Sequence, residues 1–211
     1  MPAAEAFRRR AGMAGSPAMV FEIVAAEPRH LPALPAIERA AGRLFEGKVP
    51  REVLEEGTSA DELQSAMVAG LLWVALVEGT PVGFALAEPL ARSLHLEEVD
   101  VLPEHGRCGV GRALVAAVRA AAAHRGYDSV TLTTYRAFPW NLPFYELLGF
   151  VEIPAGEVPA ELAAIVRDEA RRGLDPAVRA VLRCAVVPDP PGTAGVPAQK
   201  RCRPTRRSRS R

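Results

Sequence analysis

Hydrophobic positions along the chain follow two different periods, and the changes of period predict the order of the elements. Short apolar runs rich in β-branched residues predict strands, and apolar residues spaced three and four apart predict helices. The expected strands are 20–25, 71–77, 82–87, 94–102, 129–134 and 179–187, and the expected helices are 34–44, 59–69, 111–125, 143–148 and 161–172. Residues 47–57 are expected to form a loop.

Local signals at the element ends support this order. Ser59 followed by Glu62 is a capping box, which starts a helix. The segment 78–81, Glu-Gly-Thr-Pro, joins two apolar runs and predicts an antiparallel hairpin. The strand, helix and strand over 94–134 predict a parallel pair with a right-handed crossover. We therefore expect an α/β (α+β) fold with a mixed, mostly antiparallel central sheet flanked by helices.

Composition sets the limits of the folded region. The 211 residues, of which 49% are hydrophobic, suffice for one domain with a sizeable core. We expect a disordered leader over 1–18, a domain over 19–187 and a disordered basic tail over 188–211. No apolar run is long enough to cross a bilayer. The three cysteines have no paired spacing, which indicates a reducing compartment, so the expected localisation is cytoplasmic.

Charge is distributed unevenly along the chain. Residues 200–211 hold seven basic residues and no acidic one, and removing these seven from the 26 basic residues leaves 19 against 25 acidic residues. The body is therefore acidic and the tail basic. The tail suggests contact with nucleic acid, but it has no aromatic residue for base stacking. We expect neither a nucleic-acid nor a membrane partner.

A glycine-rich segment, residues 103–114, joins an expected strand to the most regular expected helix. Such a loop presents backbone N–H groups at the positive end of the helix dipole, where a pyrophosphate binds well. Leu114 stands where a dinucleotide fingerprint needs glycine or alanine, and the Gly-Lys-Ser/Thr of a phosphate-binding P-loop is absent. A tight turn without a ligand is the alternative.

Two segments resemble signatures of the GNAT acyltransferases. The loop resembles their acetyl-CoA pyrophosphate loop, Arg/Gln-x-x-Gly-x-Gly/Ala: Gly109 and Gly111 hold the small positions, and Gly106 replaces the Arg or Gln. Asn141, followed by Phe-Tyr-x-x-x-Gly-Phe over 144–150, resembles the second signature. The resemblance covers roughly residues 19–155. The cofactor-binding residues that it implies are Val99, Val101, Gly106, Arg107, Cys108, Gly109, Val110, Gly111, Arg112 and Asn141.

The resemblance implies direct transfer of an acetyl group from acetyl-CoA to a primary amine, with no metal. Tyr145 would protonate the leaving thiolate, because a phenol with a pKa of about 10 is close enough to a thiol. Backbone groups around Val99 and Val101 would bind the pantetheine arm and polarise the thioester carbonyl. Phe144 and Phe150 are expected in the core.

The base that deprotonates the amine stays open among Glu97, Glu98 and, less favoured, His95. Two adjacent carboxylates point to opposite faces of a regular strand, so at most one faces the site unless a bulge intervenes. We expect the acceptor to be a small-molecule amine, with a protein lysine or N-terminus as the alternative. A non-catalytic acyl-CoA-binding regulatory module is a further alternative, which the presence of Tyr145 disfavours. We also consider a homodimer.

Overall fold

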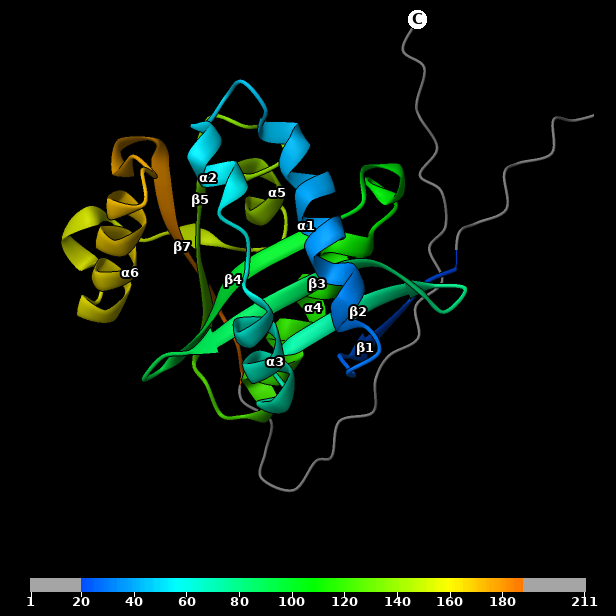
Figure 1. The fold of residues 1–211 in the computed structure, drawn as a ribbon. Coiled ribbons are helices and arrows are strands. Elements are labelled where there is room, and N and C mark those ends of the chain that lie inside the picture. The colour runs from blue at the N-terminus through cyan, green and yellow to red at the C-terminus, as the bar shows by residue number, and fades with distance from the viewer. Residues whose placement is uncertain (1–19, 188–211) are drawn as a thin grey trace, which may run out of the picture.

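Seven strands form one mixed sheet in the order β1-β2-β3-β4-β5-β7-β6 in a computed structural model that describes residues 20–187 (Figure 1). The strands are β1 (Glu22–Ala25), β2 (Leu72–Val77), β3 (Thr80–Pro89), β4 (Ser93–Val101), β5 (Ser129–Tyr135), β6 (Val151–Glu152) and β7 (Arg179–Ala185). β4 and β5 pair in parallel, and the other five pairs are antiparallel. The mixed, mostly antiparallel fold is therefore confirmed. The leader and the tail expected from the sequence lie outside the described residues.

Helices cover both faces of this sheet. They are α1 (Leu34–Gly42), α2 (Arg51–Glu55), α3 (Ala60–Val68), α4 (Val110–His124), α5 (Leu142–Glu146) and α6 (Ala160–Arg171). Figure 1 shows α1 and α3 in front of β2, β3 and β4, with α4 behind them. Short 3-10 turns complete the chain at Leu31–Ala33, Arg43–Phe45, Pro103–His105, Ala155–Glu157 and Pro176–Val178.

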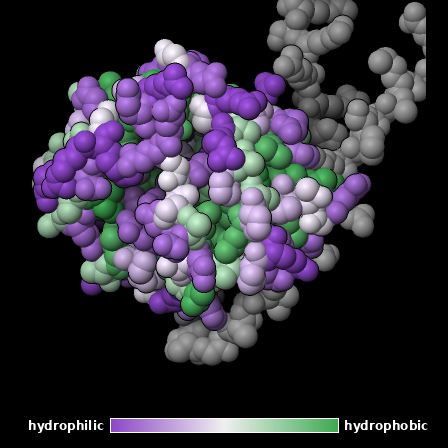
Figure 2. Space-filling view, in the orientation of Figure 1, coloured by the Kyte–Doolittle hydropathy of each residue, from purple (hydrophilic) through white to green (hydrophobic). Residues whose placement is uncertain are grey.

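The two faces of the sheet bury two separate cores, as period-two alternation along strands requires. On the front face, Leu34 and Leu63 pack with Phe84 and neighbouring apolar side chains. On the back face, Leu114 of α4 packs with Leu94 and its neighbours. The helices present their polar sides outward, and Figure 2 shows a largely hydrophilic front surface with smaller hydrophobic areas.

The elements expected from the sequence are present with ends shifted by at most two residues. The capping box is formed, with Glu62 N donating to Ser59 Oγ at 3.2 Å and Ser59 N donating to Glu62 Oε2 at 2.8 Å. The β2–β3 turn is shorter than expected: Glu78 (φ 51°) and Gly79 (φ 79°) form a two-residue turn in the left-handed region. The expected loop 47–57 contains α2, and the two-residue β6 was not expected.

The parallel pair in the middle of the sheet is incomplete. β4 and β5 are in register only from Ser93↔Ser129 to His95↔Thr131. β4 stays paired with β3 up to Val101, and β5 stays paired with β7 up to Tyr135. The sheet therefore opens between the second halves of β4 and β5, and we call this opening the splay. Within residues 20–187, no helix has the length and apolar character needed to cross a membrane.

Candidate active site

A bulge on β4 determines on which face of the sheet each side chain along one wall of the splay lies. β3 pairs Ala87 with Leu96 and Leu86 with Glu98, which leaves Glu97 as the extra residue. After the bulge, Val99 and Val101 pack on the back-face core. Glu98 and Asp100 lie on the front face, because their register partners Leu86 and Phe84 belong to the front-face core. From the sequence, at most one of Glu97 and Glu98 was expected to face the site unless a bulge intervened, and this bulge is present.

Asp100 is a site residue that the sequence reasoning missed. One of its carboxylate oxygens, Oδ2, is buried without a hydrogen-bond partner among the described residues. Its spacing of two from Glu98 places both carboxylates on one face of the strand, and this spacing was the signal that could have found it. A buried oxygen without a partner costs free energy, and a hydrogen-bond donor would remove that cost.

Helix α1 adds a fourth carboxylate, Glu38, to Glu97, Glu98 and Asp100. Glu38 follows the buried Ile37 on the side of α1 that faces the sheet, and α1 contacts β3 and β4. Its Oε1 accepts hydrogen bonds from Thr58 N at 2.9 Å and Thr58 Oγ1 at 3.1 Å. These bonds hold the carboxylate in place. We call Glu38, Glu97, Glu98 and Asp100 the acidic cluster.

The side chains of the acidic cluster repel one another, and burial followed by this repulsion raises the pKa values of Glu97, Glu98 and Asp100. Burial raises the pKa of Glu98, and the charges of Glu38 and Glu97 add to the rise. Burial also raises the pKa of Asp100 well above its usual value, with Glu98 and Glu38 adding. Partial burial, together with Glu88 and Glu62, raises the pKa of Glu97 to about 7, although Glu97 keeps contact with solvent. A carboxyl with a pKa near 7 is suited to proton transfer at neutral pH.

Tyr145 lies on α5, on the other side of the splay. Its ring makes T-shaped contacts with Phe144 and Phe150, with centroid distances of 5.1 and 5.6 Å. Phe150 is buried in the back-face core, as expected, and Phe144 is partly buried against it. Burial raises the pKa of Tyr145 above its usual value, and the charges of Glu98 and Asp100 add to the rise. The phenol is therefore fully protonated at neutral pH and close enough to β4 to feel those carboxylates.

Asn141 occupies the N-cap position of α5, but its side chain does not cap the helix. Its Nδ2 instead donates a hydrogen bond to Thr134 Oγ1 at 2.9 Å. This bond ties the β5–α5 connection to the end of β5. The side chain of Asn141 therefore positions this connection and does not cap α5.

The glycine loop runs from the end of β4 to the first turn of α4. Gly109, the N-cap, has φ 89°, in the left-handed region that favours glycine. The first helical bond runs from Ala113 N to Gly109 O, so the amides of Val110, Gly111 and Arg112 have no partner within the helix. No acidic side chain occupies this first turn. These amides are available to an anion.

Two further features of this loop bear on a bound anion. Arg107 has φ 58°, which is strained for a residue with a side chain, and such strain often marks functional loops. Arg107 and Arg112 are exposed, whereas Cys108 is half-buried and free. Gly106 lies so close to the backbone that an added Cβ would stand 3.0 Å from Pro103 O.

Gly111 links the loop to the rest of the site. A Cβ at this position would stand 3.6 Å from Phe144 Cζ and 3.9 Å from Val101 Cγ2. The start of α4, the end of β4 and helix α5 therefore meet at one point. The two sequence segments that carried the resemblance, about thirty residues apart in the chain, are brought into contact there.

His95 lies at the closed end of the splay. It is buried, and its Nδ1 is 3.1 Å from Thr131 Oγ1. Burial, followed by the charge of Arg179, lowers its pKa to about 4, so the ring is neutral at pH 7 and a weak base. Of the three candidate bases, Glu97 and Glu98 are the two that lie where the strands have parted.

Arg179 of β7 forms part of the opposite wall. Its Nη2 donates to Thr133 Oγ1 and to Glu169 Oε1, both at 2.7 Å, and its guanidinium lies 4.7 Å from the Tyr135 ring centroid. The ion pair with Glu169 is largely buried. Three polar atoms around it are buried without a partner in the described chain: Tyr135 Oη, Glu169 Oε2 and Arg179 Nε. Sequence reasoning did not anticipate this wall.

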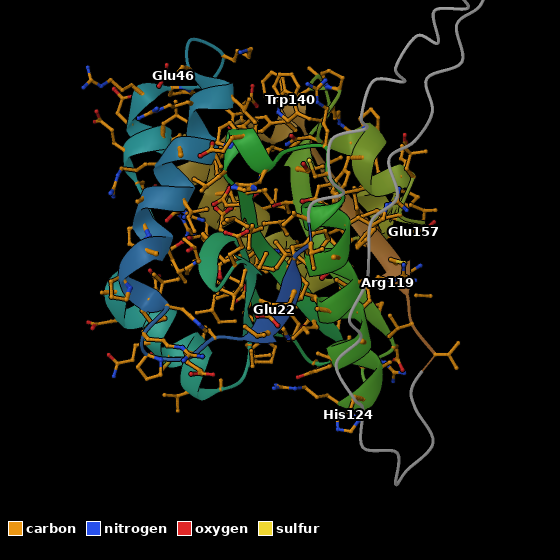
Figure 3. All side chains as sticks on the ribbon, turned by 90° about the vertical axis from the view of Figure 1, so that its right-hand side faces the viewer. Glu22, Glu46, Arg119, His124, Trp140 and Glu157 are labelled. Atoms are coloured by element: carbon orange, nitrogen blue, oxygen red, sulfur yellow. The ribbon has the colours of Figure 1, made fainter. Side chains whose placement is uncertain are left out.

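An aromatic cluster borders the same end of the molecule. Phe45, which follows α1, packs against Tyr135, Phe138 and Trp140 with centroid distances of 5.8, 5.3 and 6.2 Å. Figure 3 shows Trp140 at the end of the molecule opposite His124. The Lys48 ammonium lies 5.7 Å from the Trp140 ring centroid. These rings come from a 3-10 turn, the end of β5 and the segment after it, and such scattered positions carry no periodic signal in the sequence.

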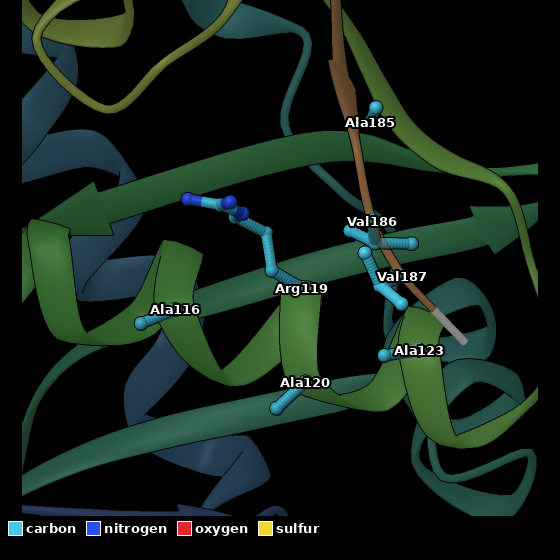
Figure 4. A pocket seen from close by; sticks show the side chains of 7 residues that line it. All are labelled: Ala116, Arg119, Ala120, Ala123, Ala185, Val186 and Val187. Atoms are coloured by element: carbon cyan, nitrogen blue, oxygen red, sulfur yellow. The ribbon is translucent and has the colours of Figure 1, made fainter. Parts of the chain in front are cut away.

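A shallow pocket elsewhere on the surface is a poor candidate for chemistry. It lies between α4 and the end of β7 and is lined by Ala116, Arg119, Ala120, Ala123, Ala185, Val186 and Val187 (Figure 4). Arg119 is its one ionisable side chain, and its Nη1 donates to Leu148 O at 3.1 Å. Over residues 20–187, no three His, Cys, Asp or Glu side chains are grouped so as to hold a metal ion.

Comparison with known proteins matches this geometry to a family. The sequence profile of the acetyltransferase (GNAT) family matches residues 36–150, which is more than half of the chain. Among solved structures, PaiA N-acetyltransferase of Thermoplasma acidophilum in complex with coenzyme A has a TM-score of 0.64 and 17% identity, over 79% of this chain and 99% of that one.

Two further structures share the fold. The ribosomal-protein-S18-alanine N-acetyltransferase of Escherichia coli has a TM-score of 0.56 and 19% identity over 83% of this chain and 99% of that one. N-acetylglutamate synthase of Neisseria gonorrhoeae, complexed with coenzyme A and N-acetyl-glutamate, has a TM-score of 0.59 and 16% identity over 79% of this chain and 35% of that one. With the profile match and the shared fold, this chain belongs to the acetyltransferase (GNAT) family.

Proposed function

We propose that this acetyltransferase moves the acetyl group of acetyl-CoA directly to a primary amine inside the splay. One observation supports the proposal: the start of α4, the end of β4 after its bulge and helix α5, which carries Tyr145, meet around Gly111. An anion site, a row of carboxylates and a protonated phenol are the three parts that acetyl transfer from a thioester needs.

The fit of the loop to a pyrophosphate rests on the chain's own atoms. The amides of Val110, Gly111 and Arg112 would donate to the phosphate oxygens, and Arg107 and Arg112 would add positive charge. Gly109 holds the left-handed turn that aims these amides outward. The pantetheine arm would then run along β4, where the backbone around Val99 and Val101 is released from β5. Asn141 would support the far wall through Thr134.

The chemistry requires one bond to form and one to break. The neutral amine nitrogen attacks the thioester carbonyl carbon, the new C–N bond forms, and the C–S bond breaks. The amine proton passes to Glu97 or Glu98, directly or through water, and the leaving thiolate takes a proton from Tyr145. A proton is returned from the base to the phenol through solvent, so the enzyme ends as it began.

The raised pKa of Tyr145 affects how readily the phenol gives its proton to the leaving thiolate. A thiol has a pKa of about 8.5, so a phenol above its usual pKa of about 10 gives up its proton reluctantly. The negative charges of Glu98 and Asp100 are part of the reason for the rise. When the amine proton arrives on Glu98, one of those charges is neutralised, and the phenol becomes a stronger acid. Protonation of Glu98 therefore favours proton release from Tyr145.

A thiol-release assay with acetyl-CoA and a panel of amines tests this function. We expect free coenzyme A to appear in step with an acetylated amine 42 Da heavier, roughly the mass of an added acetyl group minus a proton. The panel should include small amines, a lysine peptide and an N-terminal peptide. Tight coenzyme A binding without thiol release on any acceptor would instead favour the non-catalytic acyl-CoA-binding module.

A further inference from the structure

We propose, resting on the function above, that Thr134 of β5 and Arg119 of α4 are positioning residues for the general acid Tyr145. Neither side chain exchanges a proton in the reaction. Each anchors one end of helix α5, and together they fix the place from which the phenol reaches the leaving thiolate. Both lie outside the two segments, 103–114 and 140–150, that resemble the family signatures.

Helix α5 is too short to keep its position by itself. It has five residues, Leu142–Glu146, and no side chain caps its N-terminus. Isolated helices of fewer than about 12 residues are marginal in water, so the place of α5 depends on its contacts with the rest of the protein. Tyr145 is the fourth of the five residues, and any shift of α5 therefore moves the phenol.

A continuous series of hydrogen bonds runs through the backbone of Tyr145. On the N-terminal side, Asn141 Nδ2 donates to Thr134 Oγ1 at 2.9 Å, and Tyr145 N donates to Asn141 O at 3.1 Å. On the C-terminal side, Leu148 N donates to Tyr145 O at 2.9 Å, and Arg119 Nη1 donates to Leu148 O at 3.1 Å. Thr134 and Arg119 therefore each reach the Tyr145 backbone through one intermediate residue.

Both anchoring side chains come from elements that are themselves firmly packed. Thr134 is 3% exposed, and its strand β5 pairs with β7 from Ser129 to Tyr135. Arg119 is half-buried and follows Val118, which is buried in the back-face core. A functional group supported by rigid elements keeps its geometry better than one that depends on a free loop.

Arg119 also links the phenol to the helix that would bind the cofactor. Residues 111 and 119 are eight apart, which is about 12 Å along α4 at the usual rise of an α-helix. The amides proposed to hold the pyrophosphate stand at the start of the same helix. One helix would thus locate both the cofactor and the acid. Such a link matters because a displacement of about 1 Å at a reacting group can slow a reaction roughly 100-fold.

Thr134→Val tests the anchor at the start of α5, because valine keeps the shape of the side chain and removes the hydroxyl. We expect kcat to fall about tenfold, with the calorimetric affinity for coenzyme A changed less than about twofold. Thr134→Ser retains the hydroxyl and should keep most of kcat. Thr131→Val is the matched control, since it makes the same change at a buried position of β5 in the closed half of the pair, and should lower stability without lowering kcat.

Arg119→Met tests the anchor at the end of α5 by keeping the apolar stem and removing the donor to Leu148 O. We expect a similar fall in kcat, and Arg119→Lys, which keeps a donor, should recover part of it. Arg125→Met is the matched control. Arg125 also donates to backbone carbonyls at the end of a helix, Ala69 O and Gly70 O at 3.0 and 2.8 Å, but that helix is α3. Its loss should lower stability and leave kcat unchanged.

A double-mutant cycle separates positioning of the acid from a general loss of stability. If both anchors act through Tyr145, adding Thr134→Val or Arg119→Met to Tyr145→Phe should slow turnover no further, because the hydroxyl that they position is already absent. Slowing by the same factor in the wild-type and Tyr145→Phe backgrounds overturns the proposal, since the anchor then acts on another step.

The remaining outcomes separate this inference from the function it rests on. Unchanged kcat in Thr134→Val or in Arg119→Met overturns the role of that residue while acetyl transfer stands. Weaker coenzyme A binding with unchanged kcat also overturns it, in favour of a role in cofactor binding. Wild-type turnover in Tyr145→Phe leaves no acid to position and overturns the proposal as well. Absence of coenzyme A binding by the wild-type protein overturns the proposed function itself.

Discussion

The first and second halves of the β4–β5 pair use polar residues in opposite ways. In the closed half, the buried side chains of Ser93 and His95 both reach Thr131 Oγ1, at 3.4 and 3.1 Å. In the open half, Asp100 Oδ2 and Tyr135 Oη are buried without such partners in the part of the chain that the structure describes. The same two strands therefore contain polar side chains with partners and polar side chains without them, four to seven residues apart along each strand.

This difference separates stability from function within one pair of strands. Satisfied buried hydrogen bonds stabilise a fold, whereas a buried unpaired group costs free energy that only a partner restores. The closed half thus keeps β4 and β5 together. On the proposed function a ligand would complete the unpaired groups of the open half, and stability–activity trade-offs of this kind are common at active sites.

Tyr145→Phe should have the largest effect on the open half. The variant keeps the ring contacts with Phe144 and Phe150 and removes only the proton donor, so we expect kcat to fall about 100-fold, in the usual range for a lost general acid. The dissociation constant of coenzyme A, measured by calorimetry, should change less than about twofold. Wild-type turnover in this variant would remove Tyr145 from the mechanism.

Gly109→Ala tests the loop that joins the open half to α4. Its φ of 89° strains an alanine, and a left-handed residue with a side chain costs roughly 1–2 kcal/mol. We expect a similar loss of stability and about tenfold weaker coenzyme A binding.

Gly79→Ala is the matched control for this loop variant. It introduces the same side chain at φ 79° in the β2–β3 turn, where nothing lies within 4 Å of the added Cβ. It should lose comparable unfolding free energy and keep coenzyme A affinity. Equal affinities in the two variants would show that the left-handed turn of the loop has no part in binding.

A pair of substitutions contrasts the two halves directly. Thr131→Val in the closed half leaves Ser93 and His95 without their shared partner, so we expect a loss of about 1–3 kcal/mol in unfolding free energy. Asp100→Asn in the open half removes an uncompensated charge, so we expect a gain of about 1 kcal/mol. Chemical denaturation measures both. A loss in Asp100→Asn would mean that its carboxylate is already stabilised in the folded protein.

The pH dependence should run in opposite directions for stability and activity. Glu97, Glu98 and Asp100 have folded pKa values above their unfolded ones, so the folded state binds more protons and stability falls as pH rises through those values. Between pH 6.5 and 8 we expect the Tm to fall by a few degrees, since His95, whose folded pKa is about 4, opposes this trend mainly at lower pH. Over the same range kcat/KM should rise, because the base must lose its proton.

Glu97→Gln isolates one contribution to this pH dependence. Since the pKa of Glu97 is raised to about 7, its removal should flatten the decrease in Tm between pH 6.5 and 8. If Glu97 is also the base, the rise of kcat/KM near pH 7 should disappear with it. A pH profile identical to that of the wild type would assign the proton transfer to Glu98.

Much of the closed half could be predicted from sequence because its signals are local. Alternating apolar residues gave β4 and β5, and Ser59 with Glu62 gave the start of α3. The parallel crossover followed from the strand, helix and strand order. β6 was missed because two residues are too few to show a period. α2 was missed because its five residues are too few to form an apolar stripe.

The open half depended on contacts between distant segments, which a single sequence does not reveal. The β4 bulge is a register shift against β3, and nothing in Glu97 or Glu98 themselves marks it. Glu38 and Asp100 lie 62 residues apart in the chain. The effect of Glu38 on the pKa values of Glu98 and Asp100 appears only once α1 is packed on β4. The aromatic cluster is non-local for the same reason.

Calorimetric titration of the purified protein with coenzyme A tests the central claim most directly. The account predicts one site per chain, with micromolar affinity that decreases in Gly109→Ala and persists in Gly79→Ala and Tyr145→Phe. This pattern would place the pyrophosphate on the amides at the start of α4. Absence of binding heat with coenzyme A and acetyl-CoA at millimolar concentration would contradict the account.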